Sequence, residues 1–383
     1  MSTWPGKFVI GLTGNIATGK SVVRKMLEHL GAYGIDADAL GHRAIAKRAP
    51  GYKPLVELFG QWILAEDGEI DRRKLGRLAF ADPEIMHRLE AIVHPLVGQA
   101  VNWLVKRSAK SVIVIEAIKL LESDLHKHCD SIWVVTAPTE QQLERLMRKR
   151  GMSRAEAEMR IRAQGSPQAK IAAADVVIYN DGSFEKTWNQ VRKAWKLVVP
   201  QQLPTPMSTA VSHSKKLDTT QTSRLIVRKA GPKQANEIAA FLTKATGKKV
   251  SRAEVLAAFG EKAYLLLYRE EKIVGLLGWQ VENLVSRANE FHLLPGVPVE
   301  KAAPLMLAEM EQRSKELQCE IALLFLPPAL AEKKALWQKM GYALRSPESL
   351  GMRAWQEAAR ESQLPGTVML FKQLRKDRVL QPL

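Results

Sequence analysis

Cysteine is scarce in this 383-residue sequence, which contains only Cys129 and Cys319. Two isolated thiols cannot build a disulfide framework, and they fall short of the four ligands that a structural zinc site needs. So few thiols are typical of proteins kept in a reducing compartment. We therefore expect a cytoplasmic location.

Long apolar runs and a secretory leader are also missing. No stretch approaches the roughly 18 consecutive apolar residues of a membrane-spanning helix. The first residues lead directly into a strand-like segment, without the basic and apolar regions of a signal peptide. We therefore expect no membrane partner.

Acidic residues are outnumbered, at 40 against 57 Lys and Arg, so the net charge is +17. Nucleic-acid binders usually concentrate such an excess in one tail, stripe or helix, whereas here it is spread along the chain. A diffuse positive field suits small anionic substrates such as polyphosphates. We expect no nucleic-acid partner, and the sequence gives no indication of an oligomeric state.

A segment rich in Pro, Ser, Thr and Gln divides the chain at residues 200–223. It shows no apolar periodicity and cannot bury enough apolar surface to offset the entropy of ordering it. We therefore predict a first domain at residues 1–199, a flexible linker at 200–223 and a second domain at 224–383. We also expect few contacts between the domains.

The first domain alternates short apolar segments with helical stretches. The segments at residues 8–12, 112–115, 132–135 and 176–178 are apolar throughout rather than alternating. Continuous apolar strands are buried on both faces, which is typical of a parallel sheet covered by helices. The pattern predicts an α/β fold with a doubly wound parallel sheet.

Residues 14–21 read G-N-I-A-T-G-K-S and match the phosphate-binding pattern G-x-x-x-x-G-K-[ST], with an apolar strand before it and a helix after it. Glycines let the backbone turn its N–H groups toward phosphate oxygens. Lys20 adds a positive charge, and the Ser21 hydroxyl is a hard oxygen ligand suited to Mg²⁺. This phosphate loop predicts a nucleoside-triphosphate-binding domain.

Two carboxylates follow the helix after the phosphate loop, in the segment I-D-A-D at residues 35–38. We interpret this segment as a short second strand that ends at the sheet edge where ligands bind. A carboxylate opposite the γ-phosphate can accept the proton of an attacking hydroxyl group. Helix-cap or turn roles for Asp36 and Asp38 fit the spacing equally well.

Over residues 7–198 the chain resembles the dephospho-coenzyme A kinase family. The resemblance rests on the phosphate loop, on I-D-A-D, on G-E-I-D-R-R-K-L-G at 68–76 and on L-E-A-I-V-H-P-L-V at 89–97. It implies a P-loop NTPase-type domain with a helical insertion and a lid. It also implies ATP-dependent phosphorylation of the 3′-hydroxyl of dephospho-coenzyme A, the last step of coenzyme A biosynthesis. A kinase of another small nucleotide-like acceptor, or a bifunctional kinase and acyltransferase, are the alternatives.

The resemblance also implies roles for individual residues. Asp38 would be the catalytic base and Lys20 a catalytic cation, with Ser21 and Asp36 at the Mg²⁺ ion. His94 can equally be a structural residue. The implied acceptor-binding residues are Asp36, Arg72, His94 and Glu122, and Lys119 is a further candidate that departs from the family. The implied ATP-binding residues are Gly14, Asn15, Ile16, Ala17, Thr18, Gly19, Lys20, Ser21, Val22, Arg145 and Lys149.

Residues 142–164 resemble the segment that forms a lid over ATP in this family. On a helix, Gln142, Arg145 and Lys149 share one face, so the two cations could close on the triphosphate. The alternative is a solvated basic face. The chain also departs from the family, because residues 116–122 read E-A-I-K-L-L-E where the family usually shows D-x-P-L-L-x-E. We expect altered acceptor-site geometry there, with Lys119 either meeting acceptor phosphates or exposed.

The second domain reads as α/β as well. We predict a strand at 224–227, a helix at 234–244, a hairpin of 264–268 with 273–281, a helix at 302–317 and a strand at 321–326. This order, closed by W-Q-K-M-G-Y, resembles the Gcn5-related acetyltransferase fold. The glycine turn that this fold uses for acetyl-coenzyme A is replaced by a segment with Pro295 and Pro298, which lack N–H groups. We expect an acetyltransferase-like domain without acetyltransferase activity, which binds another ligand or partner or simply packs.

Overall fold

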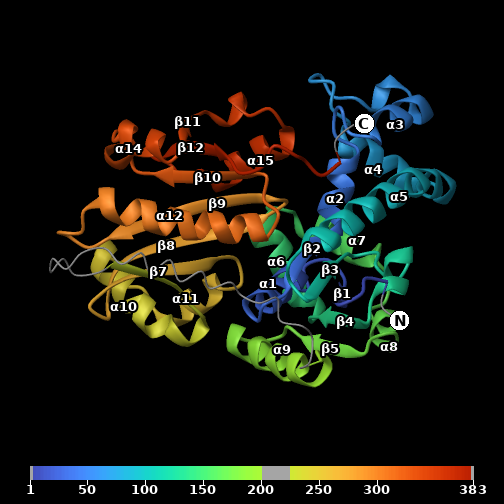
Figure 1. Cartoon of the computed structure of the whole chain (residues 1–383). Coiled ribbons are helices and arrows are strands. Elements are labelled where there is room, and N and C mark those ends of the chain that lie inside the picture. The colour runs from blue at the N-terminus through green and yellow to red at the C-terminus, as the bar shows by residue number, and fades with distance from the viewer. Residues whose placement is uncertain (1–2, 201–224, 381–383) are drawn as a thin grey trace.

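Two sheets, one parallel and one mixed, organise the part of the chain that this computed structural model describes, residues 3–200 and 225–380 (Figure 1). We call these two stretches the first and the second domain. The predicted linker lies outside the described residues apart from Pro200. None of the described helices is long and apolar enough to cross a membrane.

The first domain is organised around a five-stranded sheet in the order β2-β3-β1-β4-β5, and all its pairings are parallel. Every residue of strand β3 is buried, as the run of apolar residues predicts. The predicted parallel sheet is therefore confirmed. The strands are β1 (Phe8–Thr13), β2 (Tyr33–Asp36), β3 (Val112–Glu116), β4 (Ser131–Thr136) and β5 (Val176–Tyr179).

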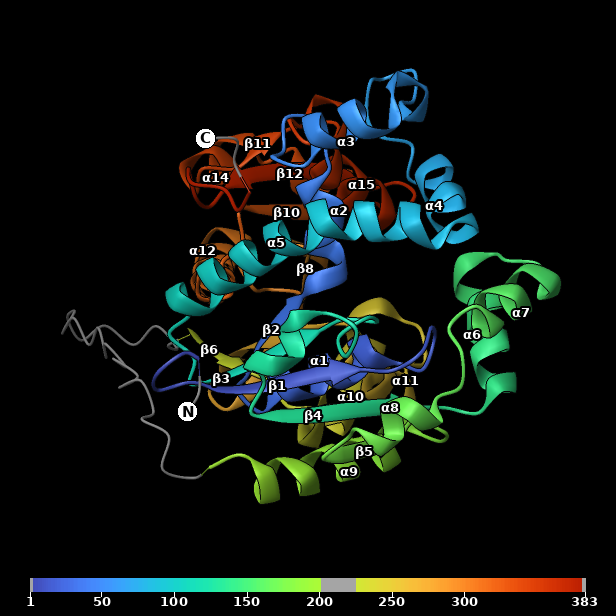
Figure 2. The same ribbon diagram turned by 90° about the vertical axis from the view of Figure 1, so that its right-hand side faces the viewer.

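Helices cover both faces of this sheet (Figure 2). Helices α1 and α9 pack on one face through Met26 and Val191, and α2 and α5 pack on the other through Leu40 and Leu104. Helices α3 and α4 form the helical insertion, while α6 and α7 form an arm beside the phosphate loop. The helices are α1 (Lys20–His29), α2 (Ala37–Ala44), α3 (Tyr52–Phe59), α4 (Arg72–Ala81), α5 (Pro83–Arg107), α6 (Thr139–Arg150), α7 (Arg154–Arg162), α8 (Gln168–Ala172) and α9 (Phe184–Val198).

The second domain holds a seven-stranded sheet in the order β11-β12-β10-β9-β8-β7-β6. Only β9 and β10 run parallel, and their pairing ends at Ala288 and Leu324, beyond which β9 pairs with β8 alone among the described residues. The predicted hairpin, long helix and strand at 321–326 are confirmed as β7-β8, α12 and β10, whereas β9 and β12 were not predicted. The strands are β6 (Leu225–Lys229), β7 (Ala263–Arg269), β8 (Lys272–Glu282), β9 (Val285–Leu293), β10 (Ile321–Leu326), β11 (Ala343–Leu344) and β12 (Val368–Gln373).

Helices also cover both faces of the second sheet. Trp337 and Met306 pack on one face, while Phe259 and Trp355 belong to two apolar clusters on the other. The helices are α10 (Ala235–Thr246), α11 (Arg252–Ala258), α12 (Val299–Glu316), α13 (Pro328–Ala331), α14 (Lys334–Lys339) and α15 (Arg353–Ser362).

A buried ion pair joins the two domains at helix α2. Arg43 Nη2 donates to Glu320 Oε1 at 2.6 Å, and the two side chains are only 4% and 1% exposed. The Glu320 carboxylate also accepts the indole N–H of Trp355 and the backbone N–H of Val379, each at 3.1 Å. Arg43 Nη1 donates to the carbonyl oxygen of Asn283 at 2.9 Å. The second domain therefore anchors α2.

Further contacts extend this interface. Leu284 of the second domain joins the apolar cluster of α2 and α5. Lys25 Nζ donates to the carbonyl oxygen of Val281 at 2.7 Å, and His29 Nε2 donates to that of Phe259 at 2.8 Å. The expectation of few contacts between the domains is therefore wrong. Linker composition says nothing about complementary groups that distant segments bring together.

We predict that replacing Glu320 by Ala lowers the free energy of unfolding by about 3–5 kcal/mol, because Arg43 would stay buried without a countercharge. Thermal and urea unfolding of the full chain measure this change. A matched control is Glu271→Ala, which removes the exposed pair that Glu271 makes with Arg228 at 3.0 Å. An exposed pair contributes about 0–1 kcal/mol, so equal losses in both variants would contradict the anchoring role of Glu320.

Candidate functional site

The phosphate loop has the backbone that its glycines predict. Gly14 and Gly19 adopt φ angles of +146° and +96°, a region that favours glycine. A Cβ atom at Gly14 would lie 2.2 Å from the carbonyl oxygen of Val135, and one at Gly19 would lie 2.0 Å from Nδ2 of Asn180. Both positions therefore require glycine, for conformation and for space.

Lys20 and Ser21 begin helix α1, and Ser21 contacts a carboxylate for which no binding role was predicted. Ser21 Oγ donates to Glu116 Oε1 at 2.9 Å, and Arg24 Nε donates to the other oxygen of that carboxylate at 2.6 Å. Lys20 is 7% exposed and its Nζ donates to the carbonyl oxygen of Asn15 at 3.2 Å. Burial lowers the pKa of Lys20, while the charges of Glu116 and Asp38 act in the opposite direction. Glu116 thus connects strand β3 to the phosphate loop.

The signal for Glu116 was available in the sequence. It is the carboxylate that closes the apolar run of β3, and β3 is the parallel neighbour of β1, which leads into the phosphate loop. Carboxyl ends of adjacent parallel strands meet at one edge of a sheet. Glu116 was predicted only to alter the acceptor site, as part of a segment that departs from the family pattern.

Asp36 and Asp38 are both brought to this edge, but Asp38 does not end a strand as predicted. Strand β2 ends at Asp36, which caps helix α2 by accepting the N–H of Ala39 at 2.9 Å, and Asp38 lies in the first turn of α2. The cap reading of Asp36 is therefore confirmed. Burial, followed by repulsion from Glu116, raises the pKa of Asp36 to about 6, although Arg24 lowers it.

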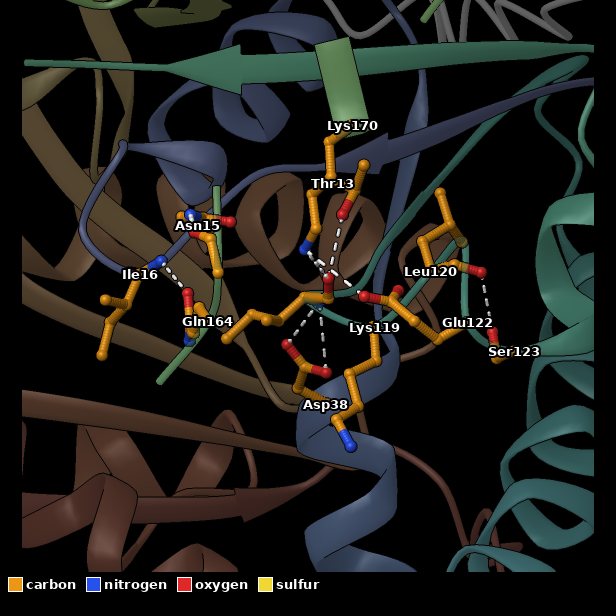
Figure 3. Close-up of polar contacts among 12 residues, drawn as sticks. Thr13, Asn15, Ile16, Asp38, Lys119, Leu120, Glu122, Ser123, Gln164 and Lys170 are labelled. Carbon is orange, nitrogen blue, oxygen red and sulfur yellow. Dashed lines mark hydrogen bonds and ion pairs between the residues drawn. The ribbon is translucent and has the colours of Figure 1, made fainter. Parts of the chain in front are cut away.

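Asp38 faces the backbone of the loop after β3 (Figure 3). Its carboxylate accepts the N–H of Ile118 with N–O distances of 3.1 and 3.4 Å. Burial raises the pKa of Asp38 above its ordinary value, while this hydrogen bond and the charge of Lys20 lower it. The carbonyl oxygen of Ile118 accepts Thr13 Oγ1 at 3.1 Å and Lys170 Nζ at 2.6 Å. The backbone of Ile118 thus connects Asp38 to β1 and to α8.

The arm formed by α6 and α7 closes onto the phosphate loop. Gln164 Oε1 accepts the backbone N–H of Ile16 at 2.6 Å, and Asn15 Nδ2 donates to the carbonyl oxygen of Gly165 at 3.1 Å (Figure 3). The N–H of Ile16 is one of the donors that a phosphate loop turns toward phosphate. Gln164 therefore occupies a donor of the predicted anion cradle.

Arg145 lies behind the phosphate loop. Its guanidinium donates to the carbonyl oxygens of Ala17 at 3.1 Å, Thr18 at 3.2 Å and Asn180 at 2.8 Å. Asn180 Nδ2 also donates to the Thr18 carbonyl oxygen, at 2.8 Å. The two side chains hold the loop backbone, and the role of Asn180 was not predicted.

Two predicted site residues pair instead with the second domain. Lys149 Nζ lies 2.7 Å from Glu261 Oε1, and Arg72 Nη2 lies 2.6 Å from Glu357 Oε1. Val22 packs into the core of the first domain and lies against Gly260. Their predicted contacts with ATP or the acceptor stay predictions.

Three predicted acceptor residues, two of them in the segment 116–122 that departs from the family pattern, do not share a partner. Lys119 Nζ pairs with Glu90 Oε1 of helix α5 at 2.6 Å, whereas Glu122 approaches Lys170 at 3.9 Å. His94 lies on α5 and has no hydrogen bond or ion pair among the residues that the structure describes. These three positions therefore do not form one contact set with Asp38.

The fit of the site to Mg²⁺ follows from the donor set. In the described residues, three or more His, Cys, Asp or Glu side chains nowhere gather as a metal site. Mg²⁺ usually keeps several waters and takes one or two protein ligands together with phosphates. Ser21 donates its proton to Glu116, so its oxygen lone pairs face outward. Glu116, which contacts Ser21 directly, therefore joins the predicted Asp36 as a candidate ligand, and hydrogen bonds already engage both Glu116 oxygens and Asp36 Oδ1.

In the second domain, the segment before α12 offers few free N–H groups. The N–H of Leu294 donates to the Val274 carbonyl oxygen at 2.9 Å, and that of Val297 to the Leu294 carbonyl oxygen at 3.2 Å. Pro295 and Pro298 have none. A cradle for a pyrophosphate group would need these donors.

Comparisons with known proteins divide along the chain. A family model described as dephospho-CoA kinase matches residues 8–186. The dephospho-CoA kinase of Carboxydothermus hydrogenoformans is 43% identical over 186 residues, which are 48% of this chain and 90% of that protein. The crystal structure of TT1252 from Thermus thermophilus is 34% identical with a TM-score of 0.46, and it covers 51% of this chain and 98% of its own.

The C-terminal part resembles other solved structures. The structure of PaiA N-acetyltransferase from Thermoplasma acidophilum in complex with coenzyme A is 11% identical with a TM-score of 0.30, and it covers 39% of this chain and 99% of its own. At this identity and TM-score the likeness adds nothing to the strand pairing, which defines the architecture of the second domain.

We predict that Asp36→Asn stabilises the protein at neutral pH. Asn is as good a helix cap as Asp, but it removes a carboxylate whose pKa is raised from 3.8 to about 6. A shift of about two units corresponds to roughly 3 kcal/mol at pH 7. Because the folded state holds this proton more tightly than the unfolded state, the gain is full above pH 6 and shrinks as pH falls toward 3.8.

Thermal unfolding at pH 7.5 and at pH 4 checks this sign. The control is Asp71→Asn at the exposed cap of α4, where hydrogen bonds from the N–H groups of Lys74 and Arg73 lower the carboxylate pKa. That variant should gain no stability at either pH. A stability gain of Asp36→Asn that is larger at pH 4 than at pH 7.5 would contradict the prediction.

Proposed function

Because the chain belongs to the dephospho-coenzyme A kinase family, we propose that it transfers the γ-phosphoryl group of ATP to the 3′-hydroxyl of dephospho-coenzyme A. The first domain carries the match, since the chain covers 90% of the relative from Carboxydothermus hydrogenoformans. The product is coenzyme A, so the enzyme catalyses the last step of its biosynthesis. ATP is the co-substrate, and a cytoplasmic location suits both substrates.

The observation that carries this proposal is the position of Asp38 beside the phosphate loop. Its carboxylate shares an electrostatic environment with Lys20 and is oriented by the N–H of Ile118. We assign it the role of general base, because a carboxylate there can take the proton of the acceptor hydroxyl as that oxygen attacks in line. Its raised pKa brings its basicity closer to that of a proton acceptor working near neutral pH.

The remaining roles follow from charge and donor geometry. Lys20 and the N–H groups of the phosphate loop stabilise the negative charge of the triphosphate. Ser21 with Glu116 or Asp36 would hold Mg²⁺, which supplies neutralisation of the β- and γ-phosphate oxygens when bound. We expect a bound triphosphate to take the N–H of Ile16 from Gln164, so that the arm of α6 and α7 reports on nucleotide binding.

No acetyl transfer is proposed for the second domain. In the segment before α12, the N–H groups of Leu294 and Val297 are used internally, and Pro295 and Pro298 have none. It contacts the first domain at several helices, among them α1, α2, α4 and α6. We assign it a structural role in the kinase.

The activity itself is tested by ADP release from the purified chain with ATP, Mg²⁺ and a set of acceptors. We expect release with dephospho-coenzyme A, and much slower release with AMP, adenosine or no acceptor. Identification of a 3′-phosphate on the product by phosphorus NMR fixes the site of transfer. Faster ADP release with another acceptor would favour a different small-molecule kinase.

We predict that Asp38→Asn lowers kcat by about 10²–10⁴-fold and leaves the Kd for ATP nearly unchanged. Lys20→Ala should weaken ATP binding and turnover together, because this cation meets the phosphates in both states. Asp181→Asn, at a partly exposed carboxylate paired with Lys186 at 2.9 Å, serves as the control. If Asp38→Asn kept more than about a third of the wild-type rate, another group would be the base.

A further inference from the structure

A second positively charged recess lies between the two domains, apart from the phosphate loop. This junction pocket has a volume of about 100 Å³ and is bordered by the C-terminal half of α1 and by residues of the second domain. Its positively charged side chains come from both domains. They are Lys25, Lys110, Lys229, Lys262 and Arg313.

Four of the five cations already have carboxylate partners, three of them as follows. Lys25 pairs with Glu28 at 2.8 Å and Lys110 with Glu316 at 3.3 Å. Lys262 pairs with Glu290 at 2.6 Å. These pairs are local and mutually satisfied, so they add little to an incoming anion.

The other two cations are left with unused donors. Lys229 has no carboxylate within ion-pair distance among the residues that the structure describes. Arg313 pairs with Glu309 at 2.5 Å, but its Nε is buried without a hydrogen-bond partner. Lys229 and the Arg313 guanidinium therefore keep hydrogen-bond donor capacity for an anion.

Electrostatic repulsion among the cations of the junction pocket also favours a bound anion. Desolvation, followed by repulsion from Arg313 and Lys110, lowers the pKa of Lys229 to about 8, while Glu28 and Glu316, which also line the pocket, act in the opposite direction. Burial lowers the pKa of the neighbouring His29 to about 4, so this ring is neutral at pH 7 and adds no charge. The carboxylates of the protein therefore balance most, but not all, of the positive charge at the pocket.

We propose that the junction pocket binds a phosphate group, with Lys229 and Arg313 as its principal ligands. A phosphate offers several acceptor oxygens and up to two negative charges, which match an ammonium and a guanidinium donor. A volume of about 100 Å³ admits a phosphate or a diphosphate, whereas whole small-molecule ligands occupy roughly 300–1,000 Å³. The ligand is inorganic phosphate, a diphosphate, or the phosphate end of a larger metabolite.

The position of the pocket links it to the first domain. Helix α1 begins with Lys20 and Ser21 at the phosphate loop and ends with His29 at the pocket. A ligand there would touch both domains and thereby favour their association. It would also stabilise the folded chain by mass action.

The test uses the full chain in a Lys20→Ala background, which weakens phosphate binding at the phosphate loop. Inorganic phosphate, pyrophosphate and glycerol 3-phosphate are titrated separately by isothermal titration calorimetry at low ionic strength. The pocket variant is Lys229→Ala with Arg313→Gln. The control, Lys272→Ala with Arg345→Gln, removes the same net charge at exposed positions outside the pocket.

We expect one site for at least one probe, with affinity weakened at least about tenfold in the pocket variant and unchanged in the control. The preferred probe identifies the source of the phosphate group. Thermal unfolding without ligand verifies that both double variants are folded. Absence of binding in the Lys20→Ala chain, or equal loss in both double variants, would overturn the proposal.

Discussion

The carboxylate of Glu320 is the point at which the two domains depend on each other. Removing a charged pair from water carries a large desolvation penalty, which only good geometry and further hydrogen bonds can offset. Here Arg43, Trp355 and Val379 all donate to the one carboxylate. Because Arg43 lies on α2, the same helix carries Asp38 in its first turn and the anchoring cation in its last. The second domain therefore helps to fix the helix that bears the proposed base.

The proposed active site shows a comparable interdependence of charges. Glu116 accepts a hydrogen bond from Ser21 with one oxygen and from Arg24 with the other, and after burial its repulsion is the next cause that raises the pKa of Asp36. Such crowding of carboxylates lowers stability, and it is typical of sites that await a cation or a polyphosphate. The Arg43–Glu320 pair and the proposed active site thus differ in how their charges are neutralised. The interface neutralises charge with protein groups, whereas the proposed active site and the junction pocket leave charge for ligands.

The sequence allowed the parallel sheet, the phosphate loop and the carboxylates of α2 to be predicted, because their signals are local. Apolar runs of four or five residues mark the strands, and glycine spacing marks the loop. Strand β9 escaped prediction because it carries polar residues that only tertiary partners satisfy. Ser286 is buried and accepts Ser314 Oγ at 2.8 Å, while Arg287 is 3% exposed beside Glu282. The interface escaped for the same reason, since Arg43 and Glu320 are 277 residues apart.

That separation along the chain also sets an order in time. A ribosome adds about 5–20 residues per second, so the carboxylate for Arg43 follows its partner by roughly 15–55 s. Val379, which completes the set of donors to Glu320, is translated later still. Throughout this interval the nascent first domain carries an unpaired arginine on α2 and an apolar surface on α2 and α5 that Leu284 has not yet covered. Its final packing is therefore a late event in biosynthesis, because the helix that bears the proposed base is fully anchored only after Val379 has been made.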